Sequence, residues 1–278
     1  MHTDTTGKIS LDHIYTQPDP RPYFGTLRGL DYRIPQLAKP HFAALIDEYR
    51  ETTGTAIPTV LDIGCSYGIN AALLKCDATM DELYDRYDGG DADTQLRSTL
   101  LARDRAFVSV RNHRRGPRVI GLDTSGPALS YALAAGFLDD AVHADLEAND
   151  PTERQRGQLA EADLVISTGC IGYVGERTIG RIVDAHGERR PWMAHFVLRM
   201  FPFEPVAERL AEAGYETVRL DRLFRQRRFA TEEEQAQVLD TLADVGVDPR
   251  GLETEGWFYA QLHLSRPRPG HMEHRGAK

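Results

Sequence analysis

The chain has 278 residues, of which 41% are hydrophobic, and its formal net charge is −9. This length and apolar fraction suffice for one large domain with a full core, which excludes a chain that is disordered throughout. The acidic balance argues against a general nucleic-acid binder, which needs a basic face.

Membrane and metal signals are missing from the sequence. No apolar run is long enough to span a bilayer and the segment 1–10 is polar, so we expect neither a membrane helix nor a signal peptide. The cysteines Cys65, Cys76 and Cys170 are odd in number and lack metal-ligand spacing, as do the scattered histidines. We therefore expect reduced thiols, a cytoplasmic location and no bound metal.

The first 57 residues mix aromatic side chains with prolines, and a helix predicted over 39–49 leads into the first strand. Tyr23 and Tyr32 are the aromatic residues of this segment most suited to contact a ligand. Two interpretations stay open, because such a segment can cover a binding site as a lid or pack as a structural strap.

The segment 59–74 carries the most specific pattern, an apolar strand, a turn with Gly64 and Gly68, and a helix. A strand–turn–helix of this type presents free backbone N–H groups to a ligand at the carboxyl end of the strand. We interpret both glycines as places where a ligand approaches the backbone closely. Asp62, at the end of the strand, is suited to hold an ammonium group or order water.

A long insertion, 77–117, separates this helix from the second strand, with helices predicted over 80–87 and 94–110. The second strand, 118–123, ends in Asp123 and is followed by Thr124 and a helix over 127–135. A carboxylate at a strand tip can accept hydrogen bonds from both hydroxyls of a ribose. Asp123 is therefore the predicted ribose ligand.

Strands and helices continue to alternate toward the C-terminus, which predicts a mostly parallel sheet covered on both faces. A helix over 231–245 has Thr231 as its N-cap and Glu234 in a capping box, and 265–278 is expected to be a flexible tail. The other elements predicted here are strands at 141–146, 163–170, 192–200, 215–220 and 257–264 and a helix at 205–213.

The turn after the first strand resembles the first motif of the class I S-adenosylmethionine (SAM)-dependent methyltransferases, Asp-x-Gly-x-Gly-x-Gly, with Ser66 in place of the middle glycine. The spacing of a dinucleotide fingerprint is absent. Over about 58–264, the resemblance implies an α/β, Rossmann-like fold of seven strands with the last inserted antiparallel. It also implies SAM as co-substrate or sole substrate.

The resemblance implies roles for individual residues. Asp145 would face the adenine amino group, and the acceptor pocket would lie beyond the fourth strand, where Cys170 and Tyr173 follow. Tyr173 and Tyr67 are the catalytic candidates, placed to orient an amine or pack against a sulfonium, and Tyr23, Tyr32 and Cys170 are the substrate and lid candidates. The implied cofactor-binding residues are Asp62, Gly64, Cys65, Ser66, Gly68, Asp123, Thr124, Asp145, Leu146, Ser167 and Thr168.

Three functions are compatible with these residues. The first is methyl transfer to a small-molecule amine, hydroxyl or carboxylate, by positioning and desolvation. The second follows a resemblance to the azetidine-2-carboxylate synthases, in which the methionine amine attacks its own γ-carbon and expels methylthioadenosine; Asp62 would then accept a proton. The third is a nucleoside-binding protein without turnover. The acceptor and the oligomeric state stay open.

Overall fold

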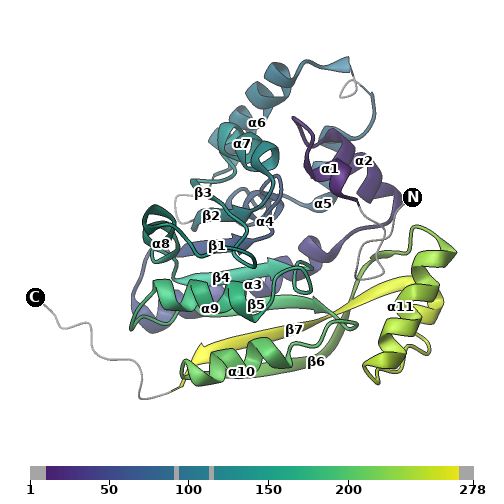
Figure 1. Ribbon diagram of the computed structural model, residues 1–278. Coiled ribbons are helices and arrows are strands. Elements are labelled where there is room, and N and C mark those ends of the chain that lie inside the picture. Colours follow the sequence, from purple (N-terminus) through teal and green to yellow (C-terminus); the bar gives the residue numbers. More distant parts are fainter. Residues whose placement is uncertain (1–10, 91–93, 113–115, 269–278) are drawn as a thin grey trace, which may run out of the picture.

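The computed structural model describes residues 11–90, 94–112 and 116–268. Within these ranges, seven strands form one sheet in the order β3-β2-β1-β4-β5-β7-β6 (Figure 1). The strands are β1 (Thr59–Ile63), β2 (Arg118–Asp123), β3 (Asp140–His143), β4 (Leu164–Thr168), β5 (Trp192–Leu198), β6 (Tyr215–Arg228) and β7 (Trp257–Pro267).

Strands β1 to β5 are parallel, and β7 is inserted antiparallel between β5 and β6. The central strands are apolar on both faces, as a sheet covered on both sides requires, and every residue of β5 is buried. This arrangement confirms the predicted fold class, including the antiparallel position of the last strand.

Two layers of helices cover the sheet, and each packs on its own hydrophobic cluster. One cluster joins α3 (Ile34–Thr53), α4 (Ile69–Lys75) and α7 (Gly126–Ala135) to one face. The other joins α8 (Glu153–Leu159), α9 (Glu176–Ala185) and α10 (Glu204–Glu212) to the opposite face. A smaller cluster holds α11 (Glu232–Asp244) against the ends of β5 and β7.

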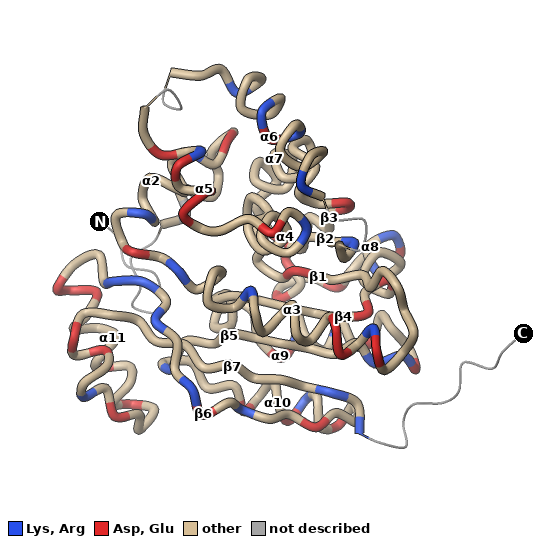
Figure 2. The backbone as a smooth tube through the Cα atoms, turned by 180° about the vertical axis from the view of Figure 1, so that it is seen from behind, with Lys and Arg blue, Asp and Glu red and all other residues tan. Residues whose placement is uncertain are grey.

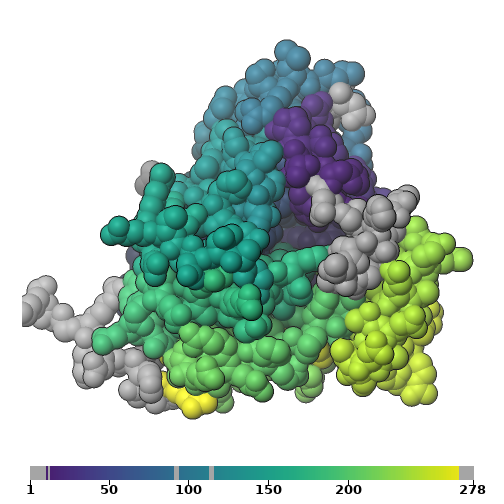
Figure 3. Space-filling model, viewed as in Figure 1, coloured from purple at the N-terminus to yellow at the C-terminus, as the bar shows by residue number. Residues whose placement is uncertain are grey.

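The N-terminal helices and the insertion pack against each other beside the sheet (Figures 1 and 3). They comprise α1 (Asp12–Tyr15), α2 (Arg21–Gly29), α5 (Met80–Tyr87) and α6 (Arg97–Arg111). The rings of Phe24 on α2 and Tyr87 on α5 stack with their centroids 4.7 Å apart. The N-terminal segment and the insertion, which are far apart in the chain, therefore pack against each other.

Buried Asp104 links the insertion to the main domain. Its Oδ2 accepts hydrogen bonds from the hydroxyls of Tyr87 and Tyr131, each at 2.6 Å, and its Oδ1 accepts one from Arg86 at 2.8 Å. A buried carboxylate needs such partners, because an unpaired one is costly. These contacts join α5, α6 and α7.

The largest difference from the predicted elements is β6, which continues past its predicted end at residue 220 to Arg228. Its pairing with β7 continues through two register shifts. Near its end, the N–H of Arg33 donates to the carbonyl of Gln226 at 2.9 Å, so the chain between α2 and α3 pairs with β6. Figure 2 shows basic residues on both of these segments.

Smaller differences concern element ends. β3 stops at His143 because Asp145 Oδ1 accepts the N–H groups of Glu147 and Ala148, each at 3.0 Å, which turns the chain away from the sheet. Thr231 caps α11 as predicted, but the Glu234 side chain binds Arg227 instead of completing a capping box.

Some helices are longer than predicted, and others were not predicted at all. The helix predicted over 39–49 is the middle of the 20-residue α3. Helices α1, α2, α8 and α9 had not been predicted, whereas β7 reaches into the predicted tail, of which 269–278 lies outside the described residues, as does 1–10. Among the helices described, none is both long and apolar enough to cross a membrane.

Candidate functional site

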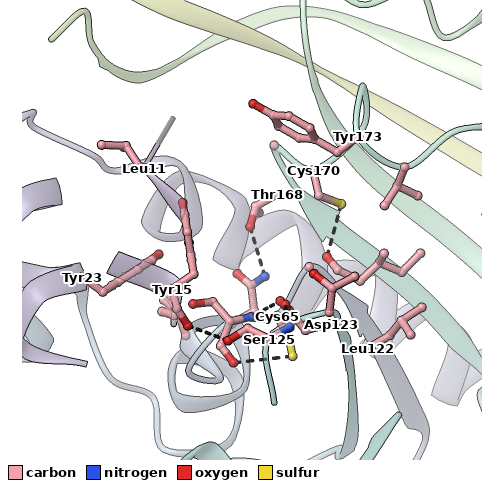
Figure 4. A pocket seen from close by; sticks show the side chains of 18 of the residues that line it. Leu11, Tyr15, Tyr23, Cys65, Leu122, Asp123, Ser125, Thr168, Cys170 and Tyr173 are labelled. Carbon is pink, nitrogen blue, oxygen red and sulfur yellow. Dashed lines mark hydrogen bonds between the residues drawn. The ribbon is translucent and has the colours of Figure 1, made fainter. Parts of the chain in front are cut away.

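A cavity of about 520 Å³ lies at the carboxyl ends of β1, β2 and β4, within the range of small-molecule sites (Figure 4). Tyr15 and Tyr23, from the N-terminal helices, stand on one side of it, and Cys170 and Tyr173 stand on the other. The cavity lies where open α/β sheets bind ligands. Of the predicted site residues, it is lined by Gly64, Cys65, Ser66, Asp123, Thr124, Asp145, Leu146, Thr168, Tyr23, Tyr32, Cys170 and Tyr173.

The turn after β1 has left-handed backbone at Gly64, Ser66 and Gly68, with φ of +66°, +49° and +79°. A Cβ on Gly64 would lie 2.7 Å from the Cβ of Cys170, and one on Gly68 would lie 3.1 Å from the Cβ of Phe137. Both glycines are therefore required by packing within the protein. Gly68 does not line the cavity, which corrects the interpretation that close ligand approach explains it.

Asp123 is held at the tip of β2 by backbone donors. The N–H of Ser66 donates to Oδ2 and the N–H of Ser125 donates to Oδ1, each at 2.8 Å. Burial raises the pKa of Asp123, while these hydrogen bonds oppose the rise. An ionised carboxylate accepts up to about four hydrogen bonds, so this one can still bind hydroxyls in the cavity.

Asp62 lies behind the cavity wall, and Asn70 stands between them. The Asn70 Nδ2 donates to Asp62 Oδ1 at 3.0 Å and to Thr168 Oγ1 at 3.2 Å. The amide oxygen of Asn70 is thereby left for the cavity, which Asn70 lines and Asp62 does not. Asp62 Oδ2 has no partner among the described residues, and burial raises the pKa of Asp62 to about 7.

Asn70 was missed in the sequence, although a signal was present. It lies two residues after Gly68, in the first turn of α4, where side chains point back toward the end of the preceding strand. Only 5% of its surface is exposed. The residues beside it in the first turn of α4 are apolar. The polar side chain at this position is therefore the feature that could have identified Asn70.

Three tyrosines from the N-terminal segment line the cavity. The rings of Tyr15 and Tyr23 meet edge to face at 5.6 Å, and the hydroxyl of Tyr32 hydrogen-bonds with Tyr23 and Thr168. Desolvation raises the pKa of Tyr23 and Tyr32 well above the usual value, so both stay protonated at neutral pH. The Ser125 hydroxyl donates to the carbonyl of Tyr15 and ties α1 to the end of β2.

Tyr67 and Ser167 do not line the cavity, which corrects their predicted positions. The Tyr67 hydroxyl donates to the carbonyl of Gln17 at 2.9 Å and lies 3.1 Å from that of Ile14, so it holds the N-terminal segment. Ser167 Oγ shares a hydrogen bond of 2.8 Å with His195 Nδ1 in the core. Neither side chain is placed to contact a molecule in the cavity.

The loop after β4 supplies no base. Tyr173 is 47% exposed at the cavity mouth. Cys170 Sγ donates to the carbonyl of Ile63 at 3.3 Å, and desolvation raises the pKa of its thiol to about 12. The thiol is thus protonated at neutral pH and a poor nucleophile, as its lack of a histidine partner in the sequence had indicated.

The loop after β3 lines the cavity with Asp145, Leu146 and Glu147. The Glu147 Oε2 accepts hydrogen bonds from the N–H of Gly175 at 2.9 Å and from the hydroxyl of Thr178 at 2.8 Å. Glu147 therefore joins the loop after β3 to the start of α9. Its function in the site is structural, and no motif or spacing in the sequence predicts it.

Residues of β6 also reach the cavity. This was not expected, because the strand was predicted to end at residue 220. Gln226 and Arg227 line the cavity. The two terminal nitrogens of the Arg227 guanidinium donate to Glu234, at 2.9 and 2.7 Å, in an ion pair that is almost fully buried. The charge of Arg227 is therefore already neutralised.

Metal-binding side chains do not gather anywhere in the described part of the chain. No group of three or more histidine, cysteine, aspartate or glutamate side chains there is placed to hold an ion. The expectation that no metal is bound stays a prediction.

No protein-family model matches the chain, and no curated protein matches it. Solved structures do. A magnesium protoporphyrin IX methyltransferase from Synechocystis PCC 6803 with bound SAM has 12% identity and a TM-score of 0.38, over 83% of this chain and 81% of that one. A TehB-like SAM-dependent methyltransferase from Corynebacterium glutamicum has 15% identity and a TM-score of 0.38, over 78% and 84%.

A third structure, the plantazolicin methyltransferase BpumL in complex with SAH, has 12% identity and a TM-score of 0.40, over 92% of this chain and 90% of that one. These scores are too low for the likenesses to carry an argument about activity. The fold assignment rests on the chain itself. Its strand order, with β7 inserted antiparallel between β5 and β6, is the order that the resemblance of the turn after β1 implied.

Proposed function

We propose that the protein is a SAM-dependent methyltransferase acting on a small molecule. The observation that carries the proposal is the order of polar groups along one cavity. Asp145 follows β3, Asp123 ends β2 and Thr168 ends β4, and these strands lie in the order β3-β2-β1-β4; Asn70 is hydrogen-bonded to Thr168. This order suits an adenine, a ribose and an amino-acid end in succession.

An unsatisfied polar atom in the cavity supports the fit of such a cofactor. Ser66 is 4% exposed, lines the cavity, and has a hydroxyl without a hydrogen-bond partner among the described residues. Buried polar groups are costly unless a partner is supplied, and a bound ligand can supply it. We propose that Asp123 binds the ribose hydroxyls and that Asn70 accepts a hydrogen bond from the amino group.

Bound SAM would supply a methyl group already activated by its sulfonium, so the protein has mainly to position the acceptor and exclude water. Positioning of this kind contributes roughly 7–11 kcal/mol. The neutral rings of Tyr15, Tyr23 and Tyr32 can stabilise a nearby cation by roughly 0.5–2 kcal/mol. Because one cavity of about 520 Å³ must hold both molecules, the acceptor is small.

The test is mass spectrometry of the nucleoside products, with SAM alone and with panels of small amines, alcohols and carboxylic acids. We expect S-adenosylhomocysteine (SAH) only when an acceptor is present. Failure of SAH to bind in calorimetry would contradict the proposal. Tight binding without any turnover would favour the nucleoside-binding alternative.

Intramolecular cyclisation to azetidine-2-carboxylate is the second candidate, and one observation favours it. The attacking amine would have to be neutral. The group that lines the cavity beyond the turn after β1 is the neutral amide of Asn70, and Asp62 lies behind it. Asp62 does not line the cavity, so its carboxylate could take the proton of the amine only through a group that lies between them. Methylthioadenosine formed from SAM without any acceptor would establish this reaction, and its absence would exclude it.

A further inference from the structure

Gln226 is a second cavity residue with an unpartnered polar atom. It lies near the end of β6, lines the cavity and is 5% exposed. Its amide oxygen, Oε1, is buried and has no hydrogen-bond partner among the described residues. Folded proteins rarely leave such an oxygen unpaired, because burying it without a donor is costly. A ligand that brings a donor would remove that cost.

The side chain is held in place from several directions. Its Nε2 lies over Gly169, where an added Cβ would be 2.2 Å away, and Gly169 has a φ of +77°. Its backbone carbonyl accepts the N–H of Arg33 at 2.9 Å. The next residue, Arg227, is fixed by its ion pair with Glu234. The position of Gln226 therefore depends on a glycine and on two long-range contacts.

Gln226 lies at the end of the cavity where an acceptor would bind. Its neighbour Gly169 directly follows Thr168, and both lie on the opposite side of the turn after β1 from Asp145. The nearby charge of Arg227 is neutralised by Glu234, and the Cys170 thiol is protonated. A hydrogen-bond acceptor in neutral surroundings selects a donor group rather than an anion.

We propose that Gln226 is a positioning residue of the acceptor subsite, whose Oε1 accepts a hydrogen bond from the N–H or O–H of a small amine or alcohol. This inference rests on the proposed methyltransferase function. The acceptor lone pair forms the bond to the methyl carbon, the carbon–sulfur bonding electrons go to sulfur, and the acceptor proton leaves to solvent. An amide cannot take that proton, so Gln226 orients the nucleophile and does not act as a base.

The test compares two nucleosides that differ at the reacting centre. Sinefungin carries an amine-bearing carbon where SAH carries its sulfur, so its extra ammonium group points to the position of the transferred methyl. In calorimetry, Gln226→Leu should lower the affinity for sinefungin about 10- to 100-fold more than the affinity for SAH, as expected for a hydrogen bond to a charged group. Gly169→Ala, which displaces Gln226, should change the ratio in the same direction.

The melting temperature of the ligand-free protein distinguishes a positioning role of Gln226 from a structural role. Since Oε1 has no partner to lose, Gln226→Leu should leave the melting temperature of the ligand-free protein unchanged or raise it. The matched control is Gln36→Leu, because Gln36 Oε1 accepts the N–H of Met80 at 2.9 Å outside the cavity. It should lower the melting temperature and leave the affinity ratio unchanged.

The outcomes distinguish failure of the proposed role of Gln226 from failure of the proposed methyltransferase function. An affinity ratio unchanged within twofold in Gln226→Leu, with SAH still bound, would overturn the role of Gln226 but not the methyltransferase function. If Gln226→Leu does not fold, the same ratio measured for Gly169→Ala and for the unbranched Gln226→Met decides in its place. Wild-type protein that binds neither nucleoside would overturn the proposed function itself.

Discussion

The two halves of the cavity are built from contacts of different range. The nucleoside half, which we define as Asp123, Asp145 and the turn from Gly64 to Ser66, follows the ends of three successive strands. Its carboxylate Asp123 is held by backbone N–H groups of the adjacent turns. Parallel strands bring their carboxyl ends to one edge, so the sheet order alone assembles this half.

The acceptor half, which we define as Tyr32, Tyr173, Gln226 and Arg227, comes from the N-terminal segment, the loop after β4 and the end of β6. It is assembled by pairing between segments almost two hundred residues apart, such as the hydrogen bond from Arg33 to Gln226. Under the proposed function, cofactor binding would depend mainly on the turns at the strand ends, and acceptor selection on pairing between distant segments. Four experiments test this difference between the two halves.

The largest effect is expected from Gly64→Val in the nucleoside half. A side chain there meets the Cβ of Cys170 at 2.7 Å and requires a φ of +66°, so the turn has to move. We expect loss of SAH binding in calorimetry. Gly54→Val is the matched control, because Gly54 also has a positive φ, +74°, but open space around its Cβ position. SAH binding retained in Gly64→Val would show that the turn does not shape the nucleoside half.

A pH dependence of stability is expected from Asp62. Its pKa is raised from 3.8 to about 7, so between these values the folded chain binds a proton that the unfolded chain has lost. Its contribution is fully present below about pH 4 and is lost as the pH rises to about 7, by up to about 4 kcal/mol. Urea unfolding at pH 4.5 and pH 7.5 measures it. Asp62→Asn should flatten the profile over that range, and an equal slope in both proteins would refute the assignment.

The next effect is expected from Asp123→Ala, which removes the proposed ribose ligand. We expect SAH affinity to fall by roughly 1.5–3 kcal/mol, the range for hydrogen bonds to a charged group. As a control, Asp163→Ala removes a carboxylate that accepts the N–H of Thr59 at 2.9 Å away from the cavity, and it should lower stability without changing affinity. Unchanged calorimetric affinity in Asp123→Ala would remove it from the ribose role.

The smallest effect is expected from Tyr67→Phe, which tests how α1 is held over the cavity. Loss of the hydrogen bond to the Gln17 carbonyl should cost roughly 0.5–1.5 kcal/mol of local stability. Faster hydrogen exchange of the amides in 11–17 would report it. Tyr84→Phe, whose hydroxyl instead donates to the Tyr32 carbonyl, is the control and should leave those amides unchanged. Equal exchange in wild type and Tyr67→Phe would mean that other contacts hold α1.

Local patterns indicated that Asp123 and Asp145 lie at the cavity, and their contacts with a nucleoside stay a prediction. Apolar runs located the central strands, and Asp123 follows one of them directly, so its place at the sheet edge could be inferred. Close approach of a ligand to Gly64 stays a prediction, whereas its packing against Cys170 could not be inferred, because Cys170 is 106 positions away in the chain. Asn70 was overlooked because its partners, Asp62 and Thr168, meet only when β1 and β4 pair.

The positions of the seven strands along the chain and the residue types at their ends could be predicted from the sequence, because these depend on hydrophobic periodicity and turn residues within short windows. Tertiary structure decided which side chains meet across the cavity. Tyr67 was turned away to the N-terminal segment, while the extension of β6 brought Gln226 onto Gly169. Such contacts depend on strand pairing and helix packing between distant segments, and no local pattern encodes them.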